Sequence, residues 1–120
     1  MTEIYKQPTS LFAQAMEREM VASHDIKGHG LPKLNLEKLN FELDHHVEKL
    51  KKACSALESD MAAGTLPSQW LNNRILEFAA DVGNCAMFYT HSYGLLNEAR
   101  LESRRQEPDL MENVYESEKQ

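Results

Sequence analysis

Residues 76–89 read LEFAADVGNCAMFY, an unbroken helical pattern around which the rest of the chain is organised. Apolar side chains recur there at steps of three and four residues, as they do along one face of an α-helix. The resulting stripe comprises Ile75, Phe78, Val82, Cys85 and Tyr89. Asp81 and Asn84 lie one helical turn apart at the edge of this stripe. Because a carboxylate and an amide are held beside a core face, we expect this helix to contribute to a functional site.

A second long helix is predicted between Asn35 and about Ala63. Its apolar residues alternate steps of four and three, which is typical of a helix packed nearly antiparallel against another. They are Leu36, Leu39, Leu43, Val47, Leu50, Cys54, Leu57 and Met61. We expect Asn35 to cap the start of the helix and Gly64 to end it in the left-handed conformation.

A shorter helix is predicted from about Thr9 or Ser10 to Ser23, with Ser10 as its N-cap. Residues 24–34, HDIKGHGLPKL, are predicted to be a loop because two glycines and a proline fall within five residues. The lysines, histidines and backbone N–H groups of such a loop can approach an anion. Composition alone favours an ordinary connection between helices.

The remaining elements complete an all-α domain. A turn at residues 65–68, with Pro67 or Ser68 at the helix start, leads into the helix of residues 76–89, which is expected to end near Tyr93. A last helix is predicted over residues 95–105. The sequence contains no strand pattern and no repeat, so we expect a helical bundle with two long antiparallel helices and shorter helices at both ends.

The boundaries of this domain follow from composition. Residues 1–107 are expected to form a single helical domain. Residues 108–120 are acidic and carry few apolar side chains, so we interpret them as a tail that is disordered or held by a partner.

Charge and composition exclude some classes of function. The formal net charge of −6 over 120 residues argues against a nucleic-acid binder, which needs clustered lysine and arginine. No apolar run approaches the length of a membrane span, and the N-terminus lacks a signal-peptide pattern. We therefore expect a cytoplasmic protein without membrane contact, in which Cys54 and Cys85 are reduced and packed as small apolar groups.

Three segments in order, MEREM at 16–20, LEKLNFELDHHVEKL at 36–50 and EFAADVGNCAMFY at 77–89, carry a family resemblance. From about Phe12 to Tyr93 the chain resembles the MazG-like nucleotide pyrophosphohydrolases, especially small phage members. In that family an E-x-x-E and an E-x-x-D on antiparallel helices hold magnesium on a nucleoside triphosphate, and water attack releases pyrophosphate. The resemblance also implies a homodimer or a dimer of dimers, whose cores are built across subunits.

Two of the four metal-binding positions of the family keep a carboxylate. Glu42 falls on the first E of E-x-x-E and Asp81 on the D of E-x-x-D, whereas His45 and Phe78 stand at the other two positions. Phe41 replaces the acid that usually precedes the first motif. The resemblance thus implies magnesium, or manganese, held weakly by Glu42, His45 and Asp81, with His45 as a catalytic base.

The resemblance also places a nucleotide against several other residues. Lys27 and Gly28 match the lysine and glycine of the family's loop, and Asn84 keeps the amide one turn after the acidic motif. Phe41 and Phe78 are expected to stack on a base or to fill the space that the missing acids leave.

The resemblance therefore implies a protein that binds a nucleoside phosphate and in which Mg-dependent pyrophosphohydrolase activity is weakened or lost, because acids for a second metal ion are missing. Two alternatives remain open. The chain is either a non-catalytic module that sequesters a nucleotide, or a helical assembly or adaptor protein that keeps only the fold.

Overall fold

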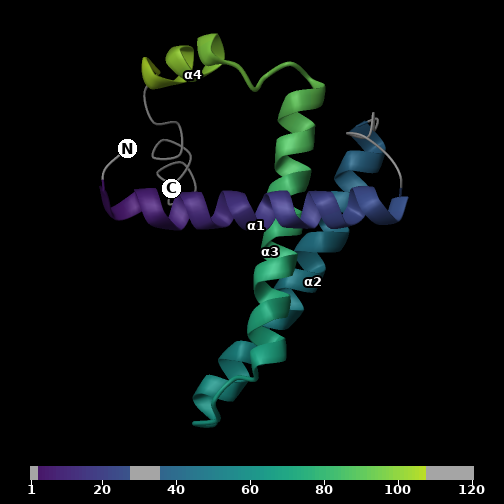
Figure 1. Ribbon diagram of the computed structural model, residues 1–120, viewed down its shortest axis with the longest axis vertical. Helices are drawn as coiled ribbons and strands as arrows, with labels where there is room; N and C mark the ends of the chain where they lie inside the picture. The colour runs from purple at the N-terminus through teal and green to yellow at the C-terminus, as the bar shows by residue number, and fades with distance from the viewer. Residues whose placement is uncertain (1–2, 28–35, 108–120) are drawn as a thin grey trace, which may run out of the picture.

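The computed structural model of the protein describes residues 3–27 and 36–107, with the exception of the side chains of residues 23–27. These residues form four helices and no strand, which confirms the all-α prediction (Figure 1). The helices are α1 (Glu3–Lys27), α2 (Leu36–Ala62), α3 (Gln69–Ser92) and α4 (Glu98–Arg105). The predicted cap Asn35, most of the predicted loop and the acidic tail lie outside the described residues.

Helices α2 and α3 form an antiparallel hairpin, as predicted (Figure 1). Gly64 ends the first arm with a φ of 73°, a left-handed conformation that glycine adopts without steric cost. Ser68 begins the second arm, because its side-chain oxygen accepts a hydrogen bond of 3.1 Å from the N–H of Leu71. The two residues predicted to delimit the turn therefore do so.

Helix α1 crosses the hairpin instead of running along it, and it packs only against α3 among the described helices (Figure 1). The crossing point is Gly83. A Cβ atom at that position would lie 3.1 Å from Met16 Sδ and 3.1 Å from Phe12 Cε1, which is tighter than ordinary packing. The absence of a side chain at Gly83 thus allows the two helices to approach closely.

The core along the hairpin is small. Five apolar side chains are buried within the described residues: Leu39, Ala53, Leu71, Ala80 and Cys85. The middle of the predicted α2 seam is half-buried, whereas Leu36 and Met61 at its two ends are exposed. No large side chain is fully buried in this part of the chain, so one copy alone leaves much apolar surface in contact with water.

The structure corrects the predicted bounds of α1. The helix begins at Glu3 rather than at a Ser10 cap, and it continues to Lys27 instead of ending at Ser23. Pro8 lies inside it, because near an exposed helix end the missing proline N–H costs one hydrogen bond that water can replace. The helix-breaking residues of the predicted loop begin only after Lys27.

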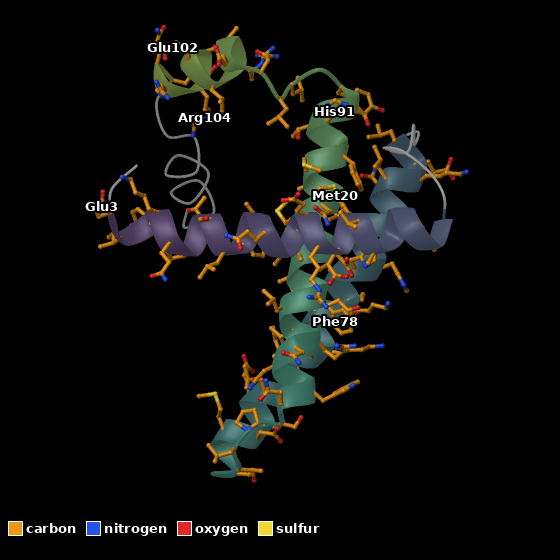
Figure 2. All side chains as sticks on the ribbon, viewed as in Figure 1. Glu3, Met20, Phe78, His91, Glu102 and Arg104 are labelled. Carbon is orange, nitrogen blue, oxygen red and sulfur yellow. The ribbon has the colours of Figure 1, made fainter. Side chains whose placement is uncertain are left out.

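Helix α4 is shorter than predicted at its start. Asn97 caps it by accepting a 2.8 Å hydrogen bond from the N–H of Arg100, so the helix begins at Glu98 rather than near Leu95. Helix α4 packs against none of α1, α2 and α3. Glu102 and Arg104 on α4 and Glu3 on α1 mark the two ends that reach away from the hairpin (Figure 2).

None of the described helices is both long enough and apolar enough to cross a lipid bilayer.

Candidate functional site

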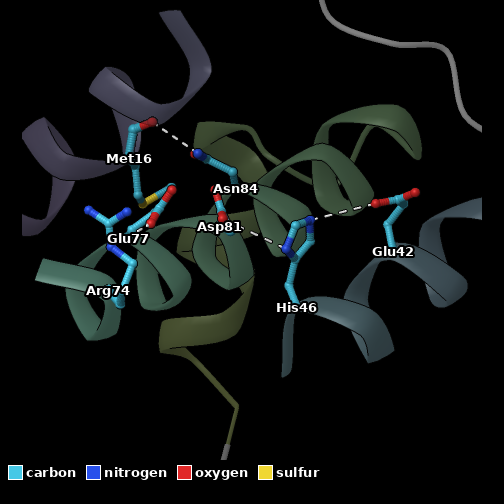
Figure 3. A network of polar contacts seen from close by, with 7 residues as sticks. All are labelled: Met16, Glu42, His46, Arg74, Glu77, Asp81 and Asn84. Carbon is cyan, nitrogen blue, oxygen red and sulfur yellow. Dashed lines mark hydrogen bonds and ion pairs between the residues drawn. The ribbon is translucent and has the colours of Figure 1, made fainter. Parts of the chain in front are cut away.

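The imidazole of His46 lies between two carboxylates that come from different helices (Figure 3). Its Nε2 atom is 3.6 Å from Glu42 Oε2 on the preceding turn of α2, and its Nδ1 atom is 3.7 Å from Asp81 Oδ2 on α3. Both distances are long for hydrogen bonds but short enough for ion pairs when the ring carries a proton. The structure thus brings Glu42 and Asp81 to one place across the hairpin.

His45, the predicted base and metal ligand, lies on the outer side of α2. It is exposed, and its ring is parallel to that of Phe41, with 6.5 Å between centroids and 2° between planes. The histidine that faces α3 is His46, which the family resemblance did not assign to the site. Glu42 and His46 are four residues apart and share a helix face. His45 is one residue before His46, so its side chain is rotated by about 100° around the helix axis and lies on another face.

The two phenylalanines at family acid positions occupy different environments. Phe41 is 69% exposed, and its ring is stacked on that of His45. Phe78 on α3 is half-buried, and Lys49 Nζ on α2 lies 5.4 Å from the centroid of its ring. An ammonium over an aromatic face at this distance is a cation–π contact. Of the two rings, Phe78 is thus the one that takes part in the contact between α2 and α3.

Asn84 turns away from His46 and joins α3 to α1 (Figure 3). The side chain is only 5% exposed, and its Nδ2 atom donates a 2.9 Å hydrogen bond to the backbone carbonyl of Met16. Its carbonyl oxygen is buried with no hydrogen-bond donor among the described residues. The predicted ligand-binding amide therefore serves the helix crossing, beside Gly83.

A carboxylate from α1 approaches the same region. Burial raises the pKa of Glu19 above its ordinary value, and the negative charges of Asp81 and Glu77 raise it further, against the opposing effect of Arg18 and Arg74. The negative field of Asp81 thus extends across the helix crossing to α1.

The same field acts on the thiol of Cys85. Burial raises its pKa to about 11, and the charges of Glu42 and Asp81 contribute in the same direction. Such a thiol stays protonated at neutral pH, which makes it a packing group and not a nucleophile. Cys85 and the half-buried Cys54 are both free, as predicted.

A groove of about 720 Å³ lies beside this region, between α1 and α3. We call it the α1–α3 groove, and its lining residues are Leu11, Gln14, Ala15, Arg18, Glu19 and Ala22 of α1 with Asn73, Arg74, Leu76, Glu77 and Ala80 of α3. Arg74 Nε lies 3.2 Å from Glu77 Oε2, and its guanidinium lies 5.6 Å from the Trp70 ring. The sequence pattern gave no indication of this groove.

The fit of a metal ion to the site is limited. Within residues 3–22 and 36–107, no group of three or more His, Cys, Asp or Glu side chains is arranged to hold one. Glu42 and Asp81 are two carboxylates with His46 between them. Magnesium can bind through one or two carboxylates when phosphate and water complete its shell, but the imidazole of His46 separates these two acids, so the described arrangement does not join them around one ion.

The loop residues assigned to the nucleotide remain untested by the structure. Lys27 is the last residue of α1, and its side chain, like the whole of Gly28, lies outside the described residues.

No family model matches the chain, and comparison with the curated proteins and with the solved structures likewise found no match.

Proposed function

We propose that the chain binds a nucleoside phosphate beside Glu42 and Asp81, with magnesium-dependent pyrophosphohydrolysis weakened or lost. The observation that supports this proposal is the pair of distances from His46 to Glu42 and Asp81, 3.6 and 3.7 Å. These two acids are the ones that the family pattern retains, and they lie on opposite sides of His46, one on each of two antiparallel helices. Glu42 and Asp81 are far apart in sequence, so it is the packing of α2 against α3 that brings both of them close to His46.

The residues around Glu42 and Asp81 also support a loss of catalytic turnover. A hydrolase of this kind needs acids for a second metal ion or for activation of the attacking water. Phe41 and Phe78 offer no carboxylate at two of the relevant positions, and His45 lies exposed on the outer side of α2. Magnesium or manganese, when bound with the nucleotide through Glu42 or Asp81, would neutralise phosphate charge.

The test is a panel of nucleoside mono-, di- and triphosphates measured in parallel for thermal shift and for pyrophosphate release, with and without magnesium or manganese. A ligand present at one hundred times its dissociation constant stabilises a protein by about 2.7 kcal/mol, which is readily seen as a rise in Tm. We expect such a rise for at least one nucleotide and little or no pyrophosphate. The variant Asp81→Asn should abolish the rise.

Glu48→Gln is the matched control, because Glu48 is an exposed acid on the same helix as Glu42. It should leave the thermal shift unchanged. Phe78→Glu restores an acid at a family position on α3 and should raise metal affinity. Rapid turnover by the natural protein would refute the loss of catalysis, and no shift with any nucleotide would refute binding.

A second candidate is an assembly or adaptor role without nucleotide. The observation that favours it is the amount of exposed apolar side chain, which includes Ile4, Tyr5, Leu66 and Trp70. If no nucleotide in the panel raises the melting temperature or releases pyrophosphate, this second role remains. It is distinguished from nucleotide binding by an oligomeric or partner-bound state that no nucleotide alters.

A further inference from the structure

The first half of α1 carries an apolar face that the other described helices leave largely uncovered. Helix α1 packs only against α3, and Gly83 of α3 meets it at Phe12 and Met16. The part of α1 before this crossing projects beyond α3 (Figure 1). At 3.6 residues per turn, four large side chains of this part fall within roughly 120° of the helix circumference. We call them the α1 face: Ile4, Tyr5, Leu11 and Phe12, which are 74%, 60%, 55% and 37% exposed.

The α1 face is large for a stretch of a single helix. With roughly 200 Å² for each large side chain, its four members leave roughly 450 Å² in contact with water. The largest apolar patch on a typical monomer measures about 300–600 Å² and is often a binding surface. The α1 face is therefore of the size that a short amphipathic segment covers.

The charges around the α1 face favour an acidic occupant. Residues 4–16 contain no acid, and their one base is Lys6, which pairs with Glu3 at 2.8 Å. The exposed Met61 near the hairpin turn, by contrast, directly follows Glu58 and Asp60 in sequence. In a chain with a net charge of −6, the α1 face is thus an apolar surface on which an acidic segment meets little repulsion.

The segment that follows α4 has the matching chemistry. Residues 108–120 read PDLMENVYESEKQ and lie outside the described residues. Four acids stand against one lysine in this segment, which gives it a net charge of −3. Its large apolar residues recur at steps of one, three and one, a spacing that gathers them on one side of a helix. They are Leu110, Met111, Val114 and Tyr115.

The point of attachment favours this segment over a separate partner. Helix α4 lies on the same side of α3 as the first half of α1, and it packs against none of α1, α2 and α3 (Figure 1). A stretch of about 13 residues spans about 20 Å as a helix and up to about 45 Å when extended. A segment held by a short linker is present at an effective concentration on the order of 1 mM, which is about a thousandfold above that of a second molecule at micromolar concentration.

We propose that residues 108–120 dock with their apolar side on the α1 face of the same chain. The proposal rests on the exposure and charge of the described residues and on the pattern of the segment, and it does not depend on nucleotide binding. The docked segment covers the half of α1 that α3 does not reach. It also ties α4, which has no packing of its own against the other helices, to the rest of the molecule.

The test is amide hydrogen exchange in the full chain, measured residue by residue by NMR. Leu110→Asp combined with Val114→Asp places two charges on the apolar side of the segment. This pair should speed exchange of the amides of residues 9–14 by roughly tenfold, as expected when the docked form is about ten times more populated than the open one. Asn113→Asp combined with Ser117→Asp is the matched control, because it adds the same charge at the same spacing of four residues but off the apolar side. It should leave this exchange unchanged.

A substitution in the α1 face tests the same contact from the other partner. Ile4→Glu alters an exposed residue in the first turn of α1, where an acid is compatible with the helix, and it should speed exchange of the amides of residues 110–116. Leu66→Glu is its control, because Leu66 is 90% exposed at the hairpin turn, away from the α1 face, and it should have no effect there. Amides in the middle of α2 and α3 report that each variant remains folded.

Three results would overturn the proposal. The first is unchanged exchange of residues 9–14 when Leu110 and Val114 are both replaced by aspartate. The second is an equal increase in the control pair, which would make added charge, and not the apolar contact, the cause. The third is protection of residues 9–14 that rises with protein concentration between 10 and 500 μM, because a second molecule would then cover the α1 face.

Discussion

Replacing Gly83 by valine should separate α1 from α3. The backbone of Gly83 lies so close to α1 that a Cβ atom would already be 3.1 Å from both Met16 Sδ and Phe12 Cε1. Valine adds two further methyl groups at the same place, and forcing extra methyl groups into a packed contact typically costs about 1–3 kcal/mol. Alanine is expected to be nearly neutral, because its gain of roughly 1 kcal/mol in helix propensity offsets a small movement of two side chains.

A second contribution comes from the neighbouring hydrogen bond. If α1 moves outward, the 2.9 Å bond from Asn84 to the carbonyl of Met16 is lost, and a buried amide without a partner costs roughly 1–3 kcal/mol. Valine recovers a few tenths of a kcal/mol of helix propensity over glycine. The net destabilisation by Gly83→Val should therefore be roughly 2–5 kcal/mol.

The assay is urea unfolding followed by circular dichroism at one fixed protein concentration, since self-association would otherwise shift the midpoint. Ala86→Val is the control, because Ala86 is exposed on the same helix and its replacement costs only about 0.5 kcal/mol of propensity. Equal stability of Gly83→Val and Ala86→Val would refute the view that α1 rests on the bare backbone at Gly83.

Three further substitutions test other contacts. Glu19→Gln should raise Tm at pH 7: the folded-state pKa of Glu19 is raised, so its charged form costs stability, and the gain should disappear as the pH falls below the ordinary pKa of 4.5. A gain that persists at low pH would contradict this cause. Ser68→Ala removes the cap of α3 and should cost about 1 kcal/mol in urea unfolding, with Ser59→Ala at an exposed position in the last turn of α2 as a harmless control. Gly94→Ala forces a side chain into a φ of 68° and should cost about 1 kcal/mol, and an unchanged midpoint would show that the chain relaxes there.

The helical hairpin could be predicted because local rules agree there. The apolar residues of α2 recur regularly, and Gly64 lies directly after the last of these turns. Ser68 lies three residues before Leu71, which is the spacing of an N-cap hydrogen bond. In α1 the same rules pointed to the wrong residue. Ser10 is a good capping residue, but the helix extends through it and through Pro8 to Glu3, so local preference did not fix the boundary.

The candidate site was only partly accessible from sequence. Glu42 and Asp81 could be paired because both belong to motifs on helices expected to be antiparallel. His46 was missed, although it stands three residues after Leu43 and four before Leu50 and so shares the inward face of α2. The family register drew attention to His45 instead.

The crossing of α1 over α3 left no signal in the hydrophobic pattern. It depends on the small residues Ala80 and Gly83, which leave room for α1. It also depends on Asn84, whose amide would be equally suitable for binding a ligand. The partner of such residues is chosen by three-dimensional packing and is not encoded in the spacing of apolar residues.

The way in which α1 is attached has a consequence for the order of folding. The two arms of the hairpin meet through a turn of six residues, 63–68, whereas the bond between Asn84 and Met16 joins residues 68 apart in sequence. Closing the longer loop costs more chain entropy, so the hairpin forms first and α1 docks onto it afterwards. In the native state the undocking of α1 is an easier opening than the separation of α2 from α3. Backbone amides of α1 should therefore exchange with deuterium through partial opening, while those in the middle of α2 and α3 exchange only when the whole hairpin unfolds.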